Sequence, residues 1–485
     1  MAGLGLHFDE AQYWVWSTHL DWGYFSKPPM IAALYHVAST LLGDEPWVFR
    51  ATAGMLYMAA AIVAGRTAQE AFGPNAGPPT TVALASIPGL AISAGFLTTD
   101  APLVLFWSVA LLLLQRASAR SSRTGHWIGL GFVVGLGLLS KYTMGAFALS
   151  AFGWLLTRPQ GRALLKQPGP WLALLIAGSV CAPNLLWNAQ HGFPTLRHTQ
   201  EISQLDRAGV RPDRLIEFLL SQMVVAGPAL LLCGLLALRR RLLGRVGTAQ
   251  PGLIDPYREG RGFFLWMSLP LLLLACVQAT LSRAQVNWAL PAYLGLTVLL
   301  VLELQTLNWQ RCRRYAVVLN LIVLAIFLHW PLLRQPLGLN AGARGDLFAR
   351  FYGWPEFAGR LQGHLDGQTI LVNDDRASLA LLAYGLRLPL ARIASWNPRG
   401  DCSSHWHCFV NLVKEPSGSE TPQRYLIVSA NIDDAQLREH FQSITRLPDD
   451  GGPNCAACQR PWRVWLAAGF RGYRSDSSSS DGTPP

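Results

Sequence analysis

The stretch FFLWMSLPLLLLACVQATL, residues 263–281, is one of ten apolar stretches that follow one another between residues 48 and 333. It contains no charged side chain and is close to the roughly 20 residues that a helix needs to cross a bilayer core. Buried helices of soluble proteins reach this length, but ten in succession do not fit a soluble core. The sequence therefore predicts a mainly α-helical, polytopic membrane domain over 48–333. The stretches are 48–66, 80–97, 101–114, 127–139, 144–157, 171–187, 215–238, 263–281, 286–304 and 315–333.

Composition and charge placement support this class. Hydrophobic residues make up 51% of the chain and charged residues only 14%, against roughly 25% charged in soluble domains. The net charge of +11 comes from arginines and lysines that gather in alternate loops. This placement indicates the topology of a membrane protein, so no nucleic-acid partner is expected. Positive loops stay in the cytoplasm, so the remaining loops are expected to face outward. The outward segments are 1–47, 98–100, 140–143, 188–214, 282–287 and everything after 333.

Residues 1–47 are too polar to span the membrane. Aromatic side chains gathered between Tyr13 and Phe25 predict helices that lie in the membrane interface. A second short helix is expected over 30–42, directly after Pro28-Pro29. Because no apolar span precedes residue 48 to carry the N-terminus outward, we expect that a leading helix is missing from this sequence. Export driven by the following helices is the alternative.

The chain changes character after residue 333. Strands are expected over 369–373, 425–430 and 463–468, and a helix over 375–386, which together predict a small extracytoplasmic α/β domain over 334–472. The Ser- and Pro-rich end, 473–485, is expected to be disordered. Two disulfides are the preferred interpretation of this region's cysteines, since an oxidising compartment favours them, with a zinc site that includes His405 and His407 as the alternative. The cysteines are Cys402, Cys408, Cys455 and Cys458.

Two acidic positions are candidates for catalysis. Asp9 and Glu10 lie within HFDEAQYWVWSTHLDWGYFSKPP, residues 7–29, where an acid pair, aromatic residues and a lysine share one outward loop. Asp100 lies in the short hairpin Thr98-Thr99-Asp100, at the outer mouth between two spans. Acids at helix N-termini also act as caps or favour the helix dipole. That structural alternative stays open for all three residues.

Cationic and aromatic residues on the same outward face complete the candidate site. Lys27, Lys141, Arg197 and Arg283 can neutralise a phosphate group at the membrane surface, although snorkelling and ordinary headgroup contacts are alternatives. Further residues are candidates for substrate binding, with structural hydrogen bonding or interface anchoring as the alternatives. They are Tyr24, His191, Asn287 and Trp288.

In this order, these motifs resemble the dolichyl-phosphate-mannose–protein mannosyltransferase and aminoarabinose transferase superfamily, which are family 39-like glycosyltransferases of the GT-C fold. The resemblance covers roughly residues 7–330 and is most specific in the first stretch. The matching stretches are DEAQYWVWSTHLDWGYFSKPPMIAAL (9–34), FLTTDAPLVLFW (96–107), GLGLLSKYT (135–143), NLLWNAQHGFPTL (184–196) and VNWALPAYLG (286–295).

The resemblance implies transfer of a sugar from a polyprenyl-phosphate carrier to a lipid, glycan or protein acceptor, at the extracytoplasmic face of a bacterial-type inner membrane. It implies that Asp9 is the first-loop catalytic acid, Asp100 the second acidic position and Lys27 a carrier-phosphate contact. His191 and Arg197 fall in a loop with further carrier contacts. Ser26 replaces the glutamate associated with a structural metal in the aminoarabinose enzymes, so no metal or other cofactor is expected.

The expected mechanism is a single displacement with inversion at the anomeric carbon, with Asp9 as general base. Lys27, with Arg197 or Arg283, would stabilise the departing phosphate. The rival class is a transporter or flippase for a lipid-linked sugar, which should hold ionisable residues near the bilayer midplane. A non-catalytic assembly protein is a third class. The sugar, the acceptor and the oligomeric state are not predicted.

Overall fold

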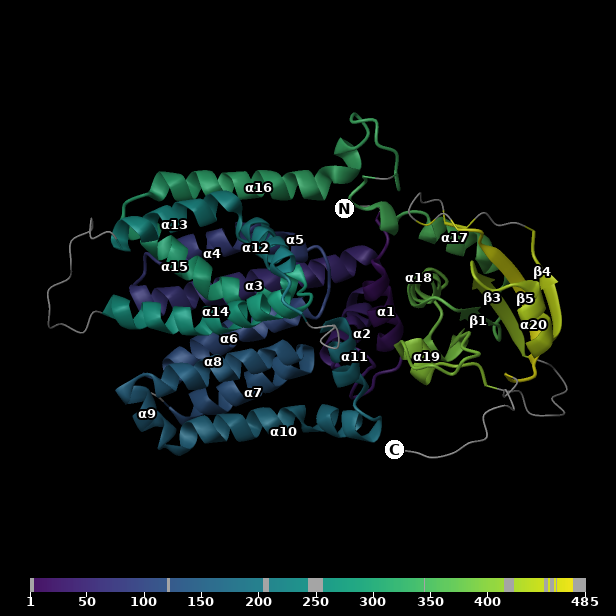
Figure 1. The fold of residues 1–485 in the computed structure, drawn as a ribbon, viewed down its shortest axis with the longest axis horizontal. Helices are drawn as coiled ribbons and strands as arrows, with labels where there is room; N and C mark the ends of the chain where they lie inside the picture. Colours follow the sequence, from purple (N-terminus) through teal and green to yellow (C-terminus); the bar gives the residue numbers. More distant parts are fainter. Residues whose placement is uncertain are drawn as a thin grey trace. The chain divides into compact units, whose positions relative to one another are not determined.

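A computed structural model describes residues 4–119, 123–203, 209–242, 256–343, 345–413, 423–448, 452–453, 458 and 460–473. The chain forms two compact units (Figure 1). The helical unit contains Asp21–His329, and the C-terminal unit joins Met1–Leu20 to Trp330–Pro485. The expected 1–47 segment is thus divided between the two units after Leu20. Residues 474–485, most of the expected disordered tail, lie outside the described residues.

The helical unit is built from apolar helices that pack side by side in Figure 1. The helices are α2 (Met30–Leu42), α3 (Pro46–Phe72), α4 (Gly77–Ser86), α5 (Pro88–Ser93), α6 (Asp100–Ala117), α7 (Thr124–Ser140), α8 (Gly145–Leu156), α9 (Pro159–Leu165), α10 (Pro168–Gln190), α11 (Pro194–Ser203), α12 (Pro212–Ala226), α13 (Pro228–Leu242), α14 (Pro256–Leu281), α15 (Ala292–Thr306) and α16 (Gln310–Leu333), with short 3-10 turns η1 (Tyr142–Met144) and η3 (Val286–Ala289). α16 ends in the C-terminal unit.

Among the described residues, five helices are long and apolar enough to cross a membrane, namely α3, α6, α10, α14 and α16, and the bent pair α12 and α13 makes up to six. Four shorter apolar helices accompany them. Several long apolar helices agree with the predicted multi-pass membrane protein. The number of ten spans stays a prediction, because the shorter helices do not reach crossing length on their own.

Two of the expected spans are not continuous helices. The stretch 80–97 divides into α4 and α5, because Pro88 cannot donate a backbone hydrogen bond and Ile87 adopts an extended conformation. The stretch 215–238 divides into α12 and α13, which differ in direction by 99°. Gly227 at that bend has φ 81°, a left-handed conformation that glycine adopts without strain, and Pro228 follows it. Each of the two stretches is thus a broken helix, and its crossing of the membrane as one span stays a prediction.

Close packing of α7 against α10 depends on glycines. A Cβ added at Gly131 would lie 2.4 Å from the carbonyl oxygen of Ala173, and one at Gly135 would lie 2.6 Å from Cβ of Val180. Side chains at these positions would push the two helices apart. Small residues at helix contacts are typical of membrane proteins, where van der Waals packing drives helix association.

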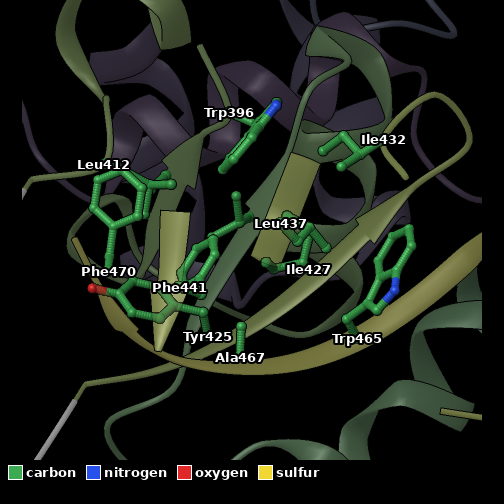
Figure 2. Close-up of a cluster of buried hydrophobic side chains, with 12 residues drawn as sticks. Trp396, Leu412, Tyr425, Ile427, Ile432, Leu437, Phe441, Trp465, Ala467 and Phe470 are labelled. Atoms are coloured by element: carbon green, nitrogen blue, oxygen red, sulfur yellow. The ribbon is translucent and has the colours of Figure 1, made fainter. Parts of the chain in front are cut away.

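The C-terminal unit is an α/β domain, as predicted. Its sheet has the order β2-β1-β3-β5-β4, with β1 parallel to β2 and β3, and β5 antiparallel to β3 and β4. The buried strands enclose a core that includes Trp396, Tyr425, Phe441 and Trp465 (Figure 2). The elements are α1 (Phe8–Ser17), η4 (Ala349–Phe351), α17 (Trp354–Leu361), η5 (Gln362–His364), β1 (Ile370–Asn373), α18 (Arg376–Gly385), η6 (Leu390–Arg392), β2 (Ile393–Ser395), α19 (His405–Phe409), β3 (Arg424–Ser429), α20 (Asp434–His440), β4 (Phe441–Arg446) and β5 (Arg463–Phe470).

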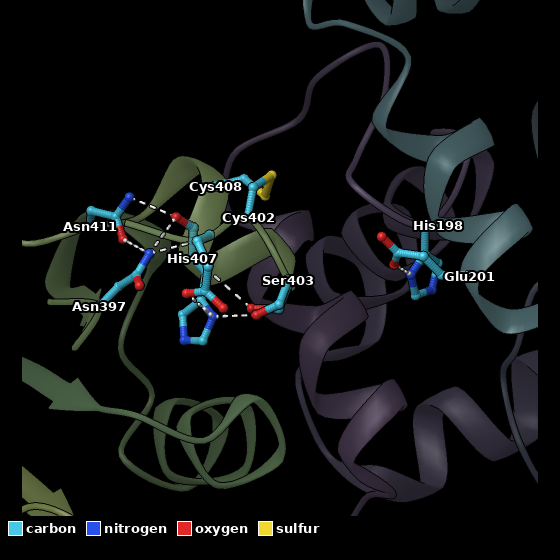
Figure 3. The surroundings of a disulfide bond; sticks show 10 residues. His198, Glu201, Asn397, Cys402, Ser403, His407, Cys408 and Asn411 are labelled. Carbon is cyan, nitrogen blue, oxygen red and sulfur yellow. Dashed lines mark hydrogen bonds and ion pairs between the residues drawn. A yellow bond between two sulfur atoms is a disulfide. The ribbon is translucent and has the colours of Figure 1, made fainter. Parts of the chain in front are cut away.

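One disulfide joins Cys402 to Cys408 at α19 (Figure 3). Nδ1 of His407 lies 2.6 Å from Oγ of Ser403, and the amide of Asn397 donates to the carbonyl oxygen of His407, so this histidine is held within the same small loop. Cys458 is also disulfide-bonded. Cys455 lies outside the described residues.

His405, the second histidine of this segment, is buried among aromatic rings. Its ring lies 5.1 Å from the Trp16 ring and 5.3 Å from the Trp406 ring, centroid to centroid. Burial, assisted by the charge of Arg376, lowers the pKa of His405 to about 3. The unfolded chain, with an ordinary histidine pKa of about 6.5, therefore binds more protons between those two pH values.

We expect the protein to lose stability as the pH falls from 6.5 toward 3, by at most about 1.4 kcal/mol per pH unit from His405. His405→Gln should remove most of this slope, since glutamine does not titrate. Chemical unfolding followed by tryptophan fluorescence at pH 7.5 and 5.5 measures the difference. An unchanged slope in the variant would show that other groups cause the acid sensitivity.

Candidate active site

Asp100, Lys141 and Asn287 meet in the helical unit. Asp100 is the first residue of α6, Lys141 directly follows α7, and Asn287 lies in η3. Nζ of Lys141 donates to Oδ1 of Asp100 over 2.8 Å, and Nδ2 of Asn287 donates to Oδ2 over 2.6 Å. The Asp100 side chain is 5% exposed and that of Lys141 18%. Both carboxylate oxygens are thus engaged by side chains that lie far away in the sequence.

A buried ion pair of this kind is costly to break, because removing one partner leaves the other charge without compensation in a poorly solvated place. The amide of Asn287 provides the additional hydrogen bond that such a pair needs. Asp100 and Lys141 therefore depend on each other for their positions at the ends of α6 and α7.

The loop that contains Lys27 is held by the C-terminal half of α10. Nε1 of Trp187 donates to Oδ2 of Asp21 over 2.8 Å, and Nδ2 of Asn184 donates to the carbonyl oxygen of Trp22 over 2.6 Å. Within the loop, the amide of Tyr24 donates to the carbonyl oxygen of Lys27, which closes a tight turn. The position of Lys27 is thus set by helix residues more than 150 positions away in sequence.

Tyr24 supports the same loop. Its side chain is 1% exposed, and its hydroxyl accepts a hydrogen bond from the amide of Asp21. Thr195 donates to its carbonyl oxygen over 3.0 Å. Burial raises the pKa of the Tyr24 hydroxyl. These contacts fix Tyr24 within the Lys27 loop, and its predicted role in substrate binding stays a prediction.

A polar bridge connects the Lys27 loop to the neighbourhood of Lys141. The hydroxyl of Tyr142, the residue after Lys141, donates to Oδ1 of Asn184 over 2.6 Å and accepts from Nδ2 of Asn188 over 3.2 Å. Sequence reasoning did not select Asn184, Asn188 or Tyr142. Asn184 inside the apolar stretch 171–187 was the available signal, because polar groups within a span need partners.

The remaining predicted residues of the helical unit lie at exposed or half-buried positions. The His191 ring stacks on the Trp187 ring at 4.2 Å between centroids, and its Nδ1 lies 2.8 Å from the carbonyl oxygen of Trp187. Arg197 and Arg283 are exposed and Trp288 is half-buried. Within the described part of the chain, no hydrogen bond or ion pair joins Asp100 or Lys141 to the side chains of Arg197, Arg283 or Trp288.

Substitution of Gly23 tests whether contact with α10 positions the Lys27 loop. A Cβ at residue 23 would lie 2.3 Å from Cε3 of Trp187, a distance that real contacts do not reach. We expect Gly23→Ala to displace the loop from α10, to cost about 1–3 kcal/mol of stability and to reduce activity.

Gly178→Ala is the matched control, since it lies in α10 with nothing within 4 Å of its added Cβ. Alanine in an exposed helix is neutral or slightly stabilising. Thermal unfolding and activity of both variants, measured side by side, check this. Equal behaviour of the two variants would contradict the proposed contact of loop and helix.

Asp9 and its partners form a second group, inside the C-terminal unit. Asp9 lies in the first turn of α1, and its Oδ1 accepts a hydrogen bond from Nη2 of Arg376 over 2.7 Å. Nε of Arg376 donates to Oε1 of Gln12, one turn further along α1. The Asp9 side chain remains 33% exposed. One guanidinium donor therefore holds the Asp9 carboxylate, a second holds Gln12, and part of the carboxylate stays accessible.

His7 caps the N-terminus of α1, the helix that contains Asp9. Its Nδ1 lies 3.3 Å from the amide of Asp9 and accepts its hydrogen bond, which caps α1. Burial lowers the pKa of His7, against the opposing effect of Asp9 and with help from Arg350 and Arg376. His7 therefore stays neutral at neutral pH, as its acceptor role requires, and does not form an ion pair with Oδ2 of Asp9, 3.6 Å away.

Glu10 differs from the prediction of a catalytic neighbour. It is fully buried, and its Oε2 accepts a hydrogen bond from the amide of His7 over 3.0 Å, completing a capping box. The structural alternative noted for the acid pair thus applies to Glu10. Arg376, in contrast, was missed by sequence reasoning, because a single arginine at the start of α18 has no distinguishing local signal.

Across the described parts of the chain, no three His, Cys, Asp or Glu side chains gather as they would around a metal ion. The independence from metal stays a prediction.

Comparisons with known proteins agree with this architecture. The family model described as dolichyl-phosphate-mannose-protein mannosyltransferase matches residues 26–187. Lipid A galacturonosyltransferase RgtD of Rhizobium johnstonii is 34% identical over 402 residues, which are 82% of this chain and 81% of that protein.

Two crystal structures of ArnT from Cupriavidus metallidurans, one apo and one bound to undecaprenyl phosphate, share the fold. Each superposes on 96% of this chain with a TM-score of 0.61, at 14% and 16% sequence identity, and these matches cover 93% and 94% of the ArnT chains. The predicted GT-C fold and the predicted membrane enzyme are confirmed. This chain belongs to the family 39-like, GT-C-fold membrane glycosyltransferases.

Proposed function

We propose that this protein transfers a sugar from a polyprenyl-phosphate carrier to the saccharide headgroup of a lipid, with Asp9 as the general base. The observation that carries the proposal is the Asp9 carboxylate, held through one oxygen by Arg376 and still one-third exposed. An ionised carboxylate accepts several hydrogen bonds, so Oδ2 stays free to receive an acceptor hydroxyl.

In the proposed reaction, Oδ2 of Asp9 takes the proton of the acceptor hydroxyl as its oxygen bonds to the anomeric carbon. The bond from that carbon to the phosphate oxygen breaks, and polyprenyl phosphate leaves with the electron pair. A single displacement with one base inverts the anomeric configuration. General-base catalysis contributes about 10²–10⁴-fold. Arg376 acts as a positioning residue, because its fork fixes the carboxylate between Gln12 and the first turn of α1.

Cations of the helical unit are proposed to stabilise the leaving phosphate. Lys27 lies in a tight turn closed by backbone hydrogen bonds with Tyr24, and Arg197 and Arg283 are exposed. Lys141 is already paired with Asp100, so its proposed role is to hold that carboxylate in place and not to bind phosphate alone. Electrostatic stabilisation of this kind needs no metal ion.

The lipid acceptor and the extracytoplasmic location are parts of the same proposal. The relative RgtD is a lipid A galacturonosyltransferase, which makes a galacturonosyl donor and lipid A the first pair to test. Because arginine-rich loops stay in the cytoplasm, we place Lys27, Asp100 and the C-terminal unit on the extracytoplasmic side. The bacterial inner membrane fits a polyprenyl carrier such as the undecaprenyl phosphate bound to ArnT.

The transporter alternative is disfavoured by where the acids lie. Asp100 begins α6, and Glu70, Glu259 and Glu303 pair with arginines near helix ends. A transporter should place such groups near the midplane.

Transfer of radiolabelled sugar from a polyprenyl-phosphate donor, in membranes that contain the full chain, tests the proposal. We expect label in the acceptor lipid with the wild type. Label that stays on the carrier, or crosses the membrane still attached to it, would contradict an enzyme.

The same transfer assay tests the positioning role of Arg376. We expect Arg376→Gln to lower kcat about tenfold with little change in KM, and Arg376→Lys to recover part of the loss, since lysine restores the charge but not the fork. A change confined to protein stability would assign Arg376 a structural role only.

A further inference from the structure

A cavity of about 320 Å³ lies within the C-terminal unit, next to the N-terminus of α1. That volume is within the range of small-molecule sites, about 300–1,000 Å³. Its walls come from both sequence segments of the unit and combine aromatic rings with cations. The residues that matter for the argument are His7, Arg350, Trp354, Asp375, Arg460 and Trp462.

The charge of the cavity is positive. Arg350 and Arg460 are both exposed, and among the described residues neither guanidinium has a carboxylate or carbonyl partner. Asp375 is the acidic residue of the lining, and its Oδ2 accepts from the amide and the hydroxyl of Ser378 as the cap of α18. Among the described lining residues, the charged side chains are thus two arginines and one carboxylate that already accepts hydrogen bonds from Ser378.

The aromatic wall is rigid. The Trp354 and Trp462 rings meet edge to face at 5.7 Å, and Nε1 of Trp462 donates to the carbonyl oxygen of Cys458 over 3.1 Å. Gly452, with φ 63°, lies so close beneath Trp462 that an added Cβ would be 2.1 Å from the ring. Arg360 in turn donates to the carbonyl oxygen of Gly452 over 2.6 Å. Large amphipathic rings held in this way suit the apolar face of a sugar.

The cavity reaches His7 and Phe8, the two residues that precede the proposed base in the chain. His7 lines it, and the same His7 accepts the hydrogen bond of the Asp9 amide, with Nδ1 3.6 Å from Oδ2 of Asp9. A saccharide bound between Arg350, Arg460 and the tryptophans would therefore lie beside His7, the neighbour of the Asp9 carboxylate.

We infer that this cavity binds an anionic saccharide, the acceptor headgroup, through a phosphate or carboxylate group, and presents a hydroxyl of that sugar to Asp9. The inference rests on the proposed function, because the acceptor hydroxyl must lie next to the general base that takes its proton. Charged guanidinium groups fit a headgroup and not a prenyl chain, which favours the acceptor over the lipid part of the donor.

The test uses the full chain in lipid nanodiscs, with Arg350→Gln/Arg460→Gln compared with the wild type. Arg446→Gln in β4, an exposed arginine outside the cavity, is the matched control. Three acceptors are supplied: lipid A with its phosphates, the same lipid after phosphatase treatment, and phosphate-free lipid A that carries an acidic sugar. The first and third separate phosphate from carboxylate as the recognised group.

We expect the wild type to prefer an anionic acceptor, and the double variant to raise KM for that acceptor about 10- to 100-fold, the range of a lost charge-assisted hydrogen bond. KM for the donor, kcat and the control variant should stay unchanged. Equal use of charged and neutral acceptors by the wild type, a rise in the donor KM, or an unchanged acceptor KM in the double variant would each overturn the inference.

Binding is measured separately from transfer, by tryptophan fluorescence during titration with each acceptor lipid. Arginine-dependent binding without any transfer by the wild type would sink the proposed function and leave an anionic-saccharide site. Transfer that ignores both arginines would sink the site and leave the proposed function.

Discussion

Asp9→Asn is expected to reduce sugar transfer by at least about 10²–10⁴-fold, the contribution of a general base. Asparagine has the same shape, and its carbonyl oxygen can still accept the hydrogen bond that Arg376 now donates to Oδ1. It cannot take up a proton from the acceptor. The measurement is the initial rate of transfer of radiolabelled sugar in membranes that contain matched amounts of each protein.

Two controls separate chemistry from folding in this experiment. Thermal unfolding and binding of the polyprenyl-phosphate carrier should be the same for Asp9→Asn and the wild type. Gln12→Glu changes the other Arg376 partner on α1 without touching Asp9, and it should retain most activity. Near-normal turnover by Asp9→Asn would remove Asp9 from the role of base.

Lys141→Met is expected to be the most destabilising single change in the helical unit, costing about 3–5 kcal/mol. It removes the cation from a carboxylate whose side chain is only 5% exposed, leaving Asp100 with the Asn287 amide alone. The stability is measured as the free energy of unfolding in detergent, with Lys166→Met, an exposed lysine after α9, as the control expected to change it by less than about 0.5 kcal/mol.

The double variant Asp100→Asn/Lys141→Met tests whether the two residues act as a pair. Asparagine removes the stranded charge and can still accept from Asn287, so the double variant should be more stable than Lys141→Met. Strictly additive losses from the two single changes would show that the pair is not coupled.

The sequence allowed the outline of this site to be predicted, but not its pairings. Asp100, Lys141 and Asn287 were each selected because they lie at ends of apolar stretches assigned to one face of the membrane. Which cation meets which acid depends on how α6, α7 and η3 pack, and that information is spread over the whole helical unit. For the same reason nothing in the sequence connected Asp9 with Arg376.

Two of the predicted site residues, Glu10 and Tyr24, are buried in the structure. Sequence alone does not say which way each of these two side chains turns. In α1 the capping box turns Glu10 inward, and in the Lys27 loop the Asp21 amide holds the Tyr24 hydroxyl.

The fold was predicted with similar limits. The strands β1, β3 and β5 were expected because they are buried and apolar, whereas β2 has three residues and β4 exposes most of its side chains at the sheet edge. The breaks at Pro88 and Gly227-Pro228 had a signal in the sequence, since proline and glycine end helices. The stretches were delimited by hydrophobicity alone, which does not detect such breaks.

The anomeric configuration of the product tests the central claim most directly. Purified protein is given a polyprenyl-phosphate sugar of known configuration, and the new glycosidic bond in the acceptor lipid is assigned by NMR. A single displacement with Asp9 as base predicts the inverted configuration. A retained configuration would contradict this account, because a single displacement from the face opposite the leaving phosphate cannot produce it.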